Sequence, residues 1–362
     1  MIESLIQHER AELTQNTQTT GPVLLSTRIR LARNLADHRF PGRASRNELK
    51  AIATKCSSSL ASLSPLQGAS IFEISALSEL ERRVLMERHL VSRELCERPE
   101  QSLVVISSDQ SISVMVNEED HLRIQVLRSG LHLRRAWRKM DSLDNALEGC
   151  VDFAFSPEFG YLTACPTNLG TGLRASAMMH LPGLIIANHM EKVIRGVNQL
   201  GLTVRGLFGE GSEAIGHIFQ ISNQQTLGES EDAILTRLDK VIKTIRDHEL
   251  NARLQLLEKN AEKLFDQMGR AFGILSQAHV ISSTEAMNLL SLLRLAVDFG
   301  ALPDTYRCLM DRMFIECQPG HVQFFGGRDY APEQRDLARA SRLREELASV
   351  PSMDFDKCKN SG

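Results

Sequence analysis

The chain has 362 residues, 42% of them hydrophobic and 24% charged, and a formal net charge of −3. This length and composition predict a globular protein of one large domain or two, and the balanced charge excludes bulk binding of nucleic acid as its main role. Seven cysteines form no Cys-x-x-Cys pair and no metal-ligand spacing with histidine, which is typical of reduced thiols and predicts no protein-bound metal. The charged N-terminus excludes a secretory signal, and no run approaches the roughly 18 apolar residues that a membrane span needs. We therefore expect a soluble cytoplasmic protein.

Alternating apolar residues predict several strands in the first two thirds of the chain. Residues 1–22 come first, as a short helical extension with a polar end. Two segments joined by a polar turn, 102–107 and 111–117, predict an antiparallel hairpin. Further strands are expected over 121–127, 201–208 and 217–222, and helical stretches over 132–150 and 174–200. The fold class predicted for residues 23–250 is therefore α+β, an antiparallel sheet flanked by helices.

Helical spacing replaces strand alternation after the last predicted strand. From 229 to about 268 the sequence is almost free of glycine and proline, and its apolar residues recur at helical intervals. Another helix opens on a capping-box pattern at 282–285, and a last one begins after Pro332. We expect an all-helical domain over 251–350 and a short tail over 351–362.

Four segments place arginine, glutamate and glycine at the ends of predicted strands. STRIRLAR puts Arg28 and Arg30 two positions apart, so on a strand both side chains point to one face. The other segments contribute Glu118, Glu119, Asp120 and Arg123 in NEEDHLR, Arg174 in LGTGLR, and Arg205 and Glu210 in RGLFGE. Taken singly, each segment is equally typical of a solvated strand face or a soluble turn.

Together these segments predict a site for a polyphosphate. Each guanidinium offers a planar pair of donors that matches phosphate oxygens, and two nearby carboxylates would orient a cationic acceptor and help to remove its proton. No GxxxxGK[ST] loop is present, nor an HRD or DFG signature, which excludes a Walker-type loop and an ordinary protein kinase. The pattern favours phosphoryl transfer from a nucleotide to a guanidinium or amine.

The segment CPTNLGTGLRAS (165–176) has three interpretations from its residues alone. Cys165 is a candidate nucleophile, the glycine pair is a candidate phosphate cradle, and the whole segment is equally a tight loop with a buried thiol. Direct transfer from ATP to a guanidinium needs no covalent enzyme intermediate. We therefore expect a positioning loop whose glycines let Arg174 reach the phosphates.

STRIR, NEEDHLR and CPTNLGTGLR, in this order, resemble the hallmark segments of the ATP:guanido phosphotransferases, the phosphagen kinases, and the resemblance covers residues from about 23 to 250. Within that family, RASAMMHLPGL, VNQLGL, RGLFGEG and RDLARA resemble the bacterial protein-arginine kinases over nearly the whole chain. The resemblance implies ATP and Mg²⁺ as cofactors and an arginine side chain of a protein as the acceptor.

The resemblance also implies the role of individual residues. Glu119 and Glu210 would hold the acceptor guanidinium, one of them as the base, and Cys165 would lie beside it as a thiolate that orients it. The implied nucleotide-binding residues are Ser26, Thr27, Arg28, Ile29, Arg30, His89, Arg123, Arg174, Ala175, Ser176, Ala177, Met178, Arg205, Gly206, Leu207, Phe208, Gly209 and Glu210.

RDLARA lies on the last predicted helix, where Arg335 and Arg339 are four residues apart and fall on one face. Spacing alone favours a solvated face with weak ion pairs. The resemblance implies instead a second pocket that recognises phosphoarginine and tunes activity, formed by Arg335, Asp336, Arg339 and Ala340. Arg335 would bind the phosphate and Asp336 the guanidinium.

Two departures from the small-molecule members of the family bear on the acceptor. Only about 25 residues precede Ser26, where those members have a helical domain whose loop closes over a free amino acid, and Phe208 stands where they tend to have arginine. Both favour a protein acceptor with exposed arginines. The alternatives are a kinase of a free guanidino metabolite and a non-catalytic phosphoarginine reader or adaptor. The family further suggests a homodimer, and an activator or protease-adaptor partner in protein quality control is a further expectation.

Overall fold

The structure is a computed structural model that describes residues 2–8, 11–15, 21–207, 214–359 of the chain. The chain divides into two compact units, and each is described here by itself. The first comprises Met1–Leu13, Ser26–Ala177 and Ser222–Lys240, and the second comprises Thr14–Leu25, Met178–Ile221 and Val241–Gly362.

Eight strands form one sheet in the order β2-β3-β4-β5-β1-β8-β10-β9. Their bounds are β1 Leu24–Arg33, β2 Ser70–Glu73, β3 Leu103–Ile106, β4 Ile112–Val116, β5 Leu122–Ser129, β8 Leu173–His180, β9 Leu202–Gly206 and β10 Ile218–Asn223. The pairs β2–β3, β3–β4, β4–β5 and β1–β5 are all antiparallel. A separate small hairpin joins β6 (Phe155–Ser156) to β7 (Gly160–Tyr161). The predicted antiparallel sheet and its 102–107/111–117 hairpin are confirmed.

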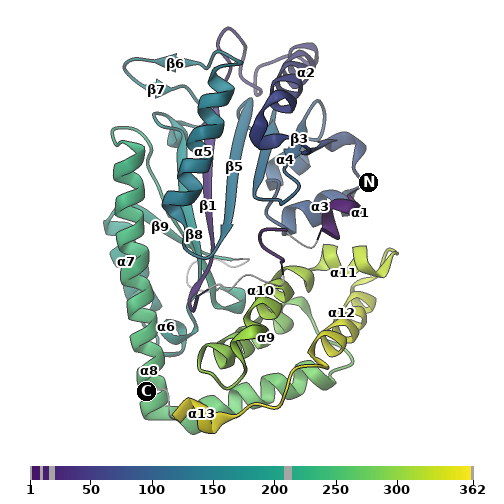
Figure 1. Cartoon of the computed structure of the whole chain (residues 1–362), viewed down its shortest axis with the longest axis vertical. Helices are drawn as coiled ribbons and strands as arrows, with labels where there is room; N and C mark the ends of the chain where they lie inside the picture. The colour runs from purple at the N-terminus through teal and green to yellow at the C-terminus, as the bar shows by residue number, and fades with distance from the viewer. Residues whose placement is uncertain (1, 9–10, 16–20, 208–213, 360–362) are drawn as a thin grey trace. The chain divides into compact units, whose positions relative to one another are not determined.

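One long helix packs on the sheet of the first unit. In α5 (Leu133–Glu148) the buried residues recur every three or four positions and form a single apolar stripe, and this helix packs against β5. Figure 1 shows α5 running beside β5. The unit's other helices are α1 (Glu3–Ile6), α2 (Arg46–Ser62), α3 (Glu79–Glu87) and α4 (Arg93–Glu97). The caps of α2 and α3 are capping boxes, in which Ser45 and Ser78 exchange hydrogen bonds with the residue three positions on. The helix predicted at the N-terminus is thus only one turn long in the described residues.

The second unit is helical around its own apolar core. Its helices are α6 (Pro182–Ile186), α7 (Met190–Gln199), most of α8 (Glu231–Gln277), α9 (Ser283–Asp298), α10 (Arg307–Glu316), α11 (Pro319–Gly326), α12 (Pro332–Leu347) and α13 (Phe355–Lys359). The core joins buried side chains of α8, α9, α10 and α12, among them Met268, Leu290 and Leu343. The predicted helical C-terminal part is therefore confirmed. Helix α8 continues past residue 250 and has a kink at Asn260, whose backbone angles are not helical.

The helix predicted over 174–200 is wrong at its beginning. Residues 173–180 form strand β8, and only α6 and α7 follow it. The segment RASAMMH is rich in residues with good helix propensity, but the strand is inserted between β1 and β10. Backbone pairing and burial there outweigh the local propensity. No helix in the described part of the chain is both long enough and apolar enough to span a membrane.

Gly170 precedes β8 and has no room for a side chain. Its φ is +104°, and a Cβ would lie 2.5 Å from the carbonyl oxygen of Thr226. Replacement by alanine is expected to destabilise the protein by about 2–4 kcal/mol, because both the backbone conformation and the contact become strained.

Urea unfolding followed by the fluorescence of Trp137, the only tryptophan, reports on the first unit. Gly42→Ala is the matched control, since nothing lies within 4 Å of its Cβ position and its φ is not positive. That control should be stabilised by about 0.4–1 kcal/mol. Equal unfolding midpoints for the two variants would contradict the assignment of strain to Gly170.

Candidate functional site

Four arginines gather on the sheet of the first unit. Arg28 and Arg30 lie on the same face of β1, while Ile29 and Leu31 between and beyond them are fully buried on the other face. Register places Ala32 opposite Arg123 on β5, so Arg123 continues the same face. The amide of Ala32 donates to the carbonyl of Gly172 at 3.1 Å, two residues before Arg174 on β8.

The cluster has an excess of positive charge for its degree of burial. Burial, with the charges of Arg123 and Arg174, lowers the pKa of Arg28 to about 10. Burial and the charges of Arg28, Arg123 and Arg174 also hold the pKa of Arg30 well below its usual value, and the Nε of Arg30 has no hydrogen-bond partner among the described residues. Cations that repel one another inside a protein are stabilised by a bound anion. The site therefore fits a ligand with several negative charges, such as a polyphosphate.

One carboxylate neutralises only part of this charge. Glu118 is buried, and its Oε2 and Oε1 lie 2.9 and 3.2 Å from Nη1 of Arg123. Burial opposes the charges of both groups, but the ion pair still raises the pKa of Arg123 and lowers that of Glu118. Arg123 is thus fixed in orientation by Glu118, a residue that had no predicted role in the site.

The acidic turn, residues 117–121, holds three carboxylates in three environments. Glu118 is paired with Arg123, Glu119 is exposed and Asp120 is buried. Partial burial raises the pKa of Glu119, and so do the negative charges of Asp120 and Glu118. A carboxylate with a raised pKa beside a cationic cluster is suited to accept a proton from a cationic acceptor.

Cys165 lies in the loop of residues 162–170, called here the Cys165 loop, directly before a 3-10 turn at Pro166–Asn168. Its thiol is partly exposed and shares a hydrogen bond with the hydroxyl of Thr167 at 3.0 Å. The amide of Ala164 donates to Asp120 Oδ1 at 2.6 Å, so this loop is attached to the acidic turn. Cys165 and Glu119 are therefore carried by two segments that are joined directly.

The remaining predicted nucleotide residues fall into three groups. In the first unit, the Thr27 hydroxyl donates to the Gly130 carbonyl at 2.6 Å, the Ala175 amide donates to Asn223 Oδ1 at 2.8 Å, and His89 has a positive φ. Ser26, Ile29, Ser176 and Ala177 also belong to it and are buried. Met178, Arg205, Gly206 and Leu207 belong to the second unit, where Arg205 is exposed at the end of β9. Phe208, Gly209 and Glu210 lie outside the described residues.

The four residues of the predicted second pocket lie on α12 in the second unit. Arg339 is 1% exposed, and its guanidinium donates to the carbonyls of Cys317 (2.7 Å) and Ile281 (2.8 Å) and to Asp336 Oδ1 (2.5 Å). Ala340 is buried in the core. Arg335 and Asp336 are partly exposed at the surface. Arg339 is therefore a structural residue that also orients Asp336.

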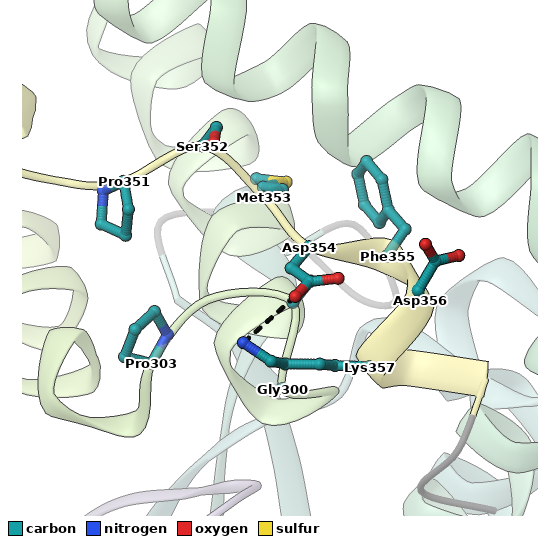
Figure 2. A pocket seen from close by; sticks show the side chains of 10 residues that line it. Gly300, Pro303, Pro351, Ser352, Met353, Asp354, Phe355, Asp356 and Lys357 are labelled. Carbon is teal, nitrogen blue, oxygen red and sulfur yellow. Dashed lines mark ion pairs between the residues drawn. The ribbon is translucent and has the colours of Figure 1, made fainter.

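A cavity of about 840 Å³ lies elsewhere in the second unit, between Gly300–Pro303 and the tail at 351–357. Figure 2 shows its lining, with an ion pair of 3.1 Å between Lys357 and Asp354. None of the predicted site residues lines it. No cluster of three or more His, Cys, Asp or Glu side chains that could hold a metal occurs in the described ranges.

Comparison with known proteins gives the family. A family model described as "ATP:guanido phosphotransferase, C-terminal catalytic domain" matches residues 51–252, more than half of the chain. The chain belongs to the ATP:guanido phosphotransferase family. As a member of this family it is an ATP-dependent phosphotransferase with a guanido acceptor. A second model, described as "Protein-arginine kinase McsB C-terminal domain", matches residues 261–358.

Similar proteins and structures agree with this assignment. A protein named "Protein-arginine kinase" from Symbiobacterium thermophilum is 44% identical, over 91% of this chain and 95% of its own. One of the same name from Brevibacillus brevis is 41% identical, over 92% and 94%. Lombricine kinase has a TM-score of 0.56 at 24% identity, over 68% of this chain and 72% of its own. A taurocyamine kinase from Schistosoma mansoni has a TM-score of 0.57 at 22% identity, over 76% and 47%. At these identities the two structures show the shared guanido kinase fold alone.

Two buried residues, one beside the acidic turn and one within it, were not identified from the sequence. Asn34 and Asp120 are buried and hydrogen-bonded to each other, and neither was expected to act in the site. Asp120 could have been identified from the sequence, because it lies in the acidic run of residues 118–120. Asn34 gave none, because a single asparagine after a strand is an ordinary turn residue.

Arg30→Gln is expected to weaken ATP binding about 10- to 100-fold, since a hydrogen bond to a charged group is worth about 1.5–3 kcal/mol. The same substitution should leave the nucleotide-free protein at least as stable, because it removes one of the mutually repelling buried cations. The two readouts are the dissociation constant of ATP and the free energy of unfolding without nucleotide.

Arg135→Gln on the exposed face of α5 is the matched control and should change neither quantity. If Arg30→Gln binds ATP as tightly as the wild type, the arginine cluster is not the phosphate site.

Proposed function

We propose that this protein transfers the γ-phosphoryl group of ATP to the guanidinium of arginine side chains in proteins. The observation that supports it most is the contrast within one unit: an arginine cluster with excess charge lies beside an exposed carboxylate of raised pKa. The cluster suits the phosphates of one substrate, and the carboxylate suits the guanidinium of the other.

In the proposed mechanism, Arg28, Arg30 and Arg174 bind the phosphate oxygens of ATP and neutralise the charge that develops during transfer. Arg123 does the same while Glu118 fixes its orientation. Glu119 binds the acceptor guanidinium and takes a proton from the attacking nitrogen as the new N–P bond forms and ADP leaves. Arg205 is proposed to bind ATP and Glu210 to hold the acceptor guanidinium, because the segment that carries them resembles the corresponding segment of the family.

Mg²⁺ is proposed to accompany ATP rather than to occupy a site of its own. Magnesium in kinases is held mostly by substrate phosphates with one or two carboxylates, and the described residues contain no cluster of three acidic or histidine ligands. When bound, the ion supplies positive charge at the β- and γ-phosphates. Cys165 is proposed to lie beside the acceptor guanidinium, where its sulfur helps to orient the nitrogen that attacks.

A protein acceptor is supported by the relatives and by the second family model. Proteins that are 41–45% identical over at least 90% of this chain are named protein-arginine kinase. The rival acceptor is a free guanidino metabolite, as in lombricine and taurocyamine kinases, whose similarity to this chain is limited to the fold.

Incubation with ATP, Mg²⁺ and an unfolded arginine-rich protein is expected to yield acid-labile phosphate on arginine, detected by mass spectrometry at neutral pH. Glu119→Gln should lower kcat about 10²- to 10⁴-fold, because it removes a general base, and should leave the KM for ATP within about two-fold. Glu73→Gln, an exposed carboxylate on β2, is the matched control and should change neither quantity.

Transfer to free arginine without transfer to protein would establish the metabolite alternative. Wild-type turnover by Glu119→Gln would remove this residue from the mechanism.

We further propose that Arg335, Asp336, Arg339 and Ala340 form a second site for phosphoarginine that regulates activity. Arg335 and Asp336 are consecutive residues of α12 and both are partly exposed, so this part of the helix offers a cation and an anion to a group that carries both phosphate and guanidinium. In this proposal Arg339 acts through its hydrogen bond to Asp336, and Ala340 through the packing that holds α12.

Arg335→Ala is expected to weaken the binding of phosphoarginine about 10- to 100-fold, since it removes the partner of the phosphate. Within the described residues its guanidinium donates one long hydrogen bond, 3.5 Å, to the Tyr330 carbonyl, so the fold should be little affected. Titration calorimetry measures the affinity, and Arg270→Ala on α8 is the control. Unchanged affinity in Arg335→Ala would refute the pocket.

The organisation of the chain is also proposed from these observations. We propose a helical extension over 1–22, a catalytic domain over 23–250, a helical domain over 251–350 and a tail over 351–362, supported by the two matched ranges, 51–252 and 261–358. A cytoplasmic homodimer that works with an activator or a protease-adaptor partner remains a proposal from the family.

A further inference from the structure

Asn34 lies at the meeting point of three segments of the first unit. It follows directly on β1, which carries Arg28 and Arg30, and its side chain is 1% exposed. Its Nδ2 donates to Asp120 Oδ1 at 2.6 Å and to the Leu162 carbonyl at 3.0 Å, and its Oδ1 accepts from the His121 amide at 2.9 Å. One buried amide thus joins the end of the strand, the acidic turn and the Cys165 loop.

Asp120 also joins the acidic turn to the Cys165 loop. Its Oδ1 accepts from Asn34 and also from the Ala164 amide at 2.6 Å, and the side chain is 2% exposed. These two side chains make three hydrogen bonds to other described residues, and two of these bonds end on the Cys165 loop, at Leu162 and Ala164, just before Cys165. A buried carboxylate is costly to desolvate unless such donors are present, so both partners depend on each other.

His121, the last residue of the acidic turn, holds the end of this turn in place. Its Nδ1 accepts from the Leu35 amide at 3.1 Å, and its Nε2 lies 2.9 Å from the Arg39 carbonyl. Burial lowers the pKa of His121 to about 4, so the ring is neutral at pH 7 with the proton on Nε2, as these two partners require. The turn that carries Glu119 is thereby attached to the chain after β1 by backbone and side-chain bonds alike.

We propose that Asn34 and Asp120 are positioning residues of the acceptor site, forming a clamp that holds the Cys165 loop against the turn that carries Glu119. The proposal rests on the proposed function, since it assigns these two residues to the binding of the same guanidinium. Neither residue reaches the exposed surface where an acceptor would bind, so both act through Glu119 and Cys165.

The charge of Asp120 has a second effect on the same site. Burial, Asp120 and Glu118 raise the pKa of Glu119, while Arg123 lowers it, and Glu94 on α4 adds a further negative charge. Replacing Asp120 by asparagine removes one of the negative neighbours, so the pKa of Glu119 falls. The geometry is retained, because an amide oxygen can still accept from Asn34 and Ala164.

Two variants separate the hold on the Cys165 loop from the effect of the Asp120 charge on the pKa of Glu119. Asn34→Ala removes the hydrogen bonds to Asp120 and Leu162, so the loop loosens. We expect kcat/KM for the protein acceptor to fall about 10- to 100-fold, as for a misplaced catalytic group, with the KM for ATP within about two-fold of wild type. Alkylation of Cys165 by iodoacetamide, mapped by mass spectrometry, should become several-fold faster.

Cys150 is an exposed thiol of the same unit and serves as the internal reference for alkylation. Asp109→Asn is the matched control variant, because Asp109 also holds a turn through a backbone amide but lies in the β3–β4 hairpin. Neither Cys150 in Asn34→Ala nor Cys165 in Asp109→Asn should change its rate.

Asp120→Asn should keep the Cys165 alkylation rate and move the acidic limb of the kcat/KM profile to lower pH, because Glu119 ionises earlier. If Asn34→Ala does not fold, Asp120→Ala takes its place, because it removes the oxygen that accepts from Asn34 and Ala164, and the same selective acceleration at Cys165 is expected. A folded Asn34→Ala with unchanged Cys165 alkylation and unchanged acceptor kinetics overturns the clamp, and so does an equal acceleration at Cys150. An unshifted profile in Asp120→Asn overturns the effect of the Asp120 charge on Glu119. If the wild type does not phosphorylate arginine but Asn34→Ala still accelerates Cys165 selectively, the proposed function fails and the clamp stands.

Discussion

The repulsion among buried guanidinium groups is the constraint around which the first unit is organised. Arg28, Arg30 and Arg174 lie on or beside the strands that pair in the middle of the sheet, and Arg123 next to them is paired with the buried carboxylate of Glu118. Such an arrangement destabilises the protein without its ligand. It persists because the flanking strands fix each arginine through backbone pairing, and because a bound polyphosphate neutralises the charges that repel one another.

The acidic turn shows how environment assigns different roles to adjacent carboxylates. Glu118 orients Arg123, Asp120 holds two backbone segments together, and Glu119 is left at the surface with a raised pKa. Three like charges in consecutive positions would repel strongly if all were equally exposed. Pairing one with a cation and burying another among donors leaves a single carboxylate available for chemistry.

The fold was largely predictable where side-chain alternation is clear. The hairpin of β3 and β4, strand β5 and the helices α9 and α12 follow directly from periodicity and caps. Strand β8 was not, because RASAMMH has helical propensity and becomes a strand only through its neighbours β1 and β10. Of the candidate site, the arginines and Glu119 are predictions from the resemblance, whereas the hydrogen bonds of Arg339 to the Cys317 and Ile281 carbonyls were visible only in the packed structure.

The sequence by itself determined that Arg28 and Arg30 share one face of a strand, because side chains alternate with a period of two. It also determined the family, because the arginine-bearing and acidic segments occur together in order. Only the tertiary structure decided that Glu118 rather than Glu119 pairs with Arg123, and that Asn34 reaches Asp120, 86 positions away. Contacts of that kind depend on the register between strands and on which turn is buried, and neither property is encoded in any local stretch of residues.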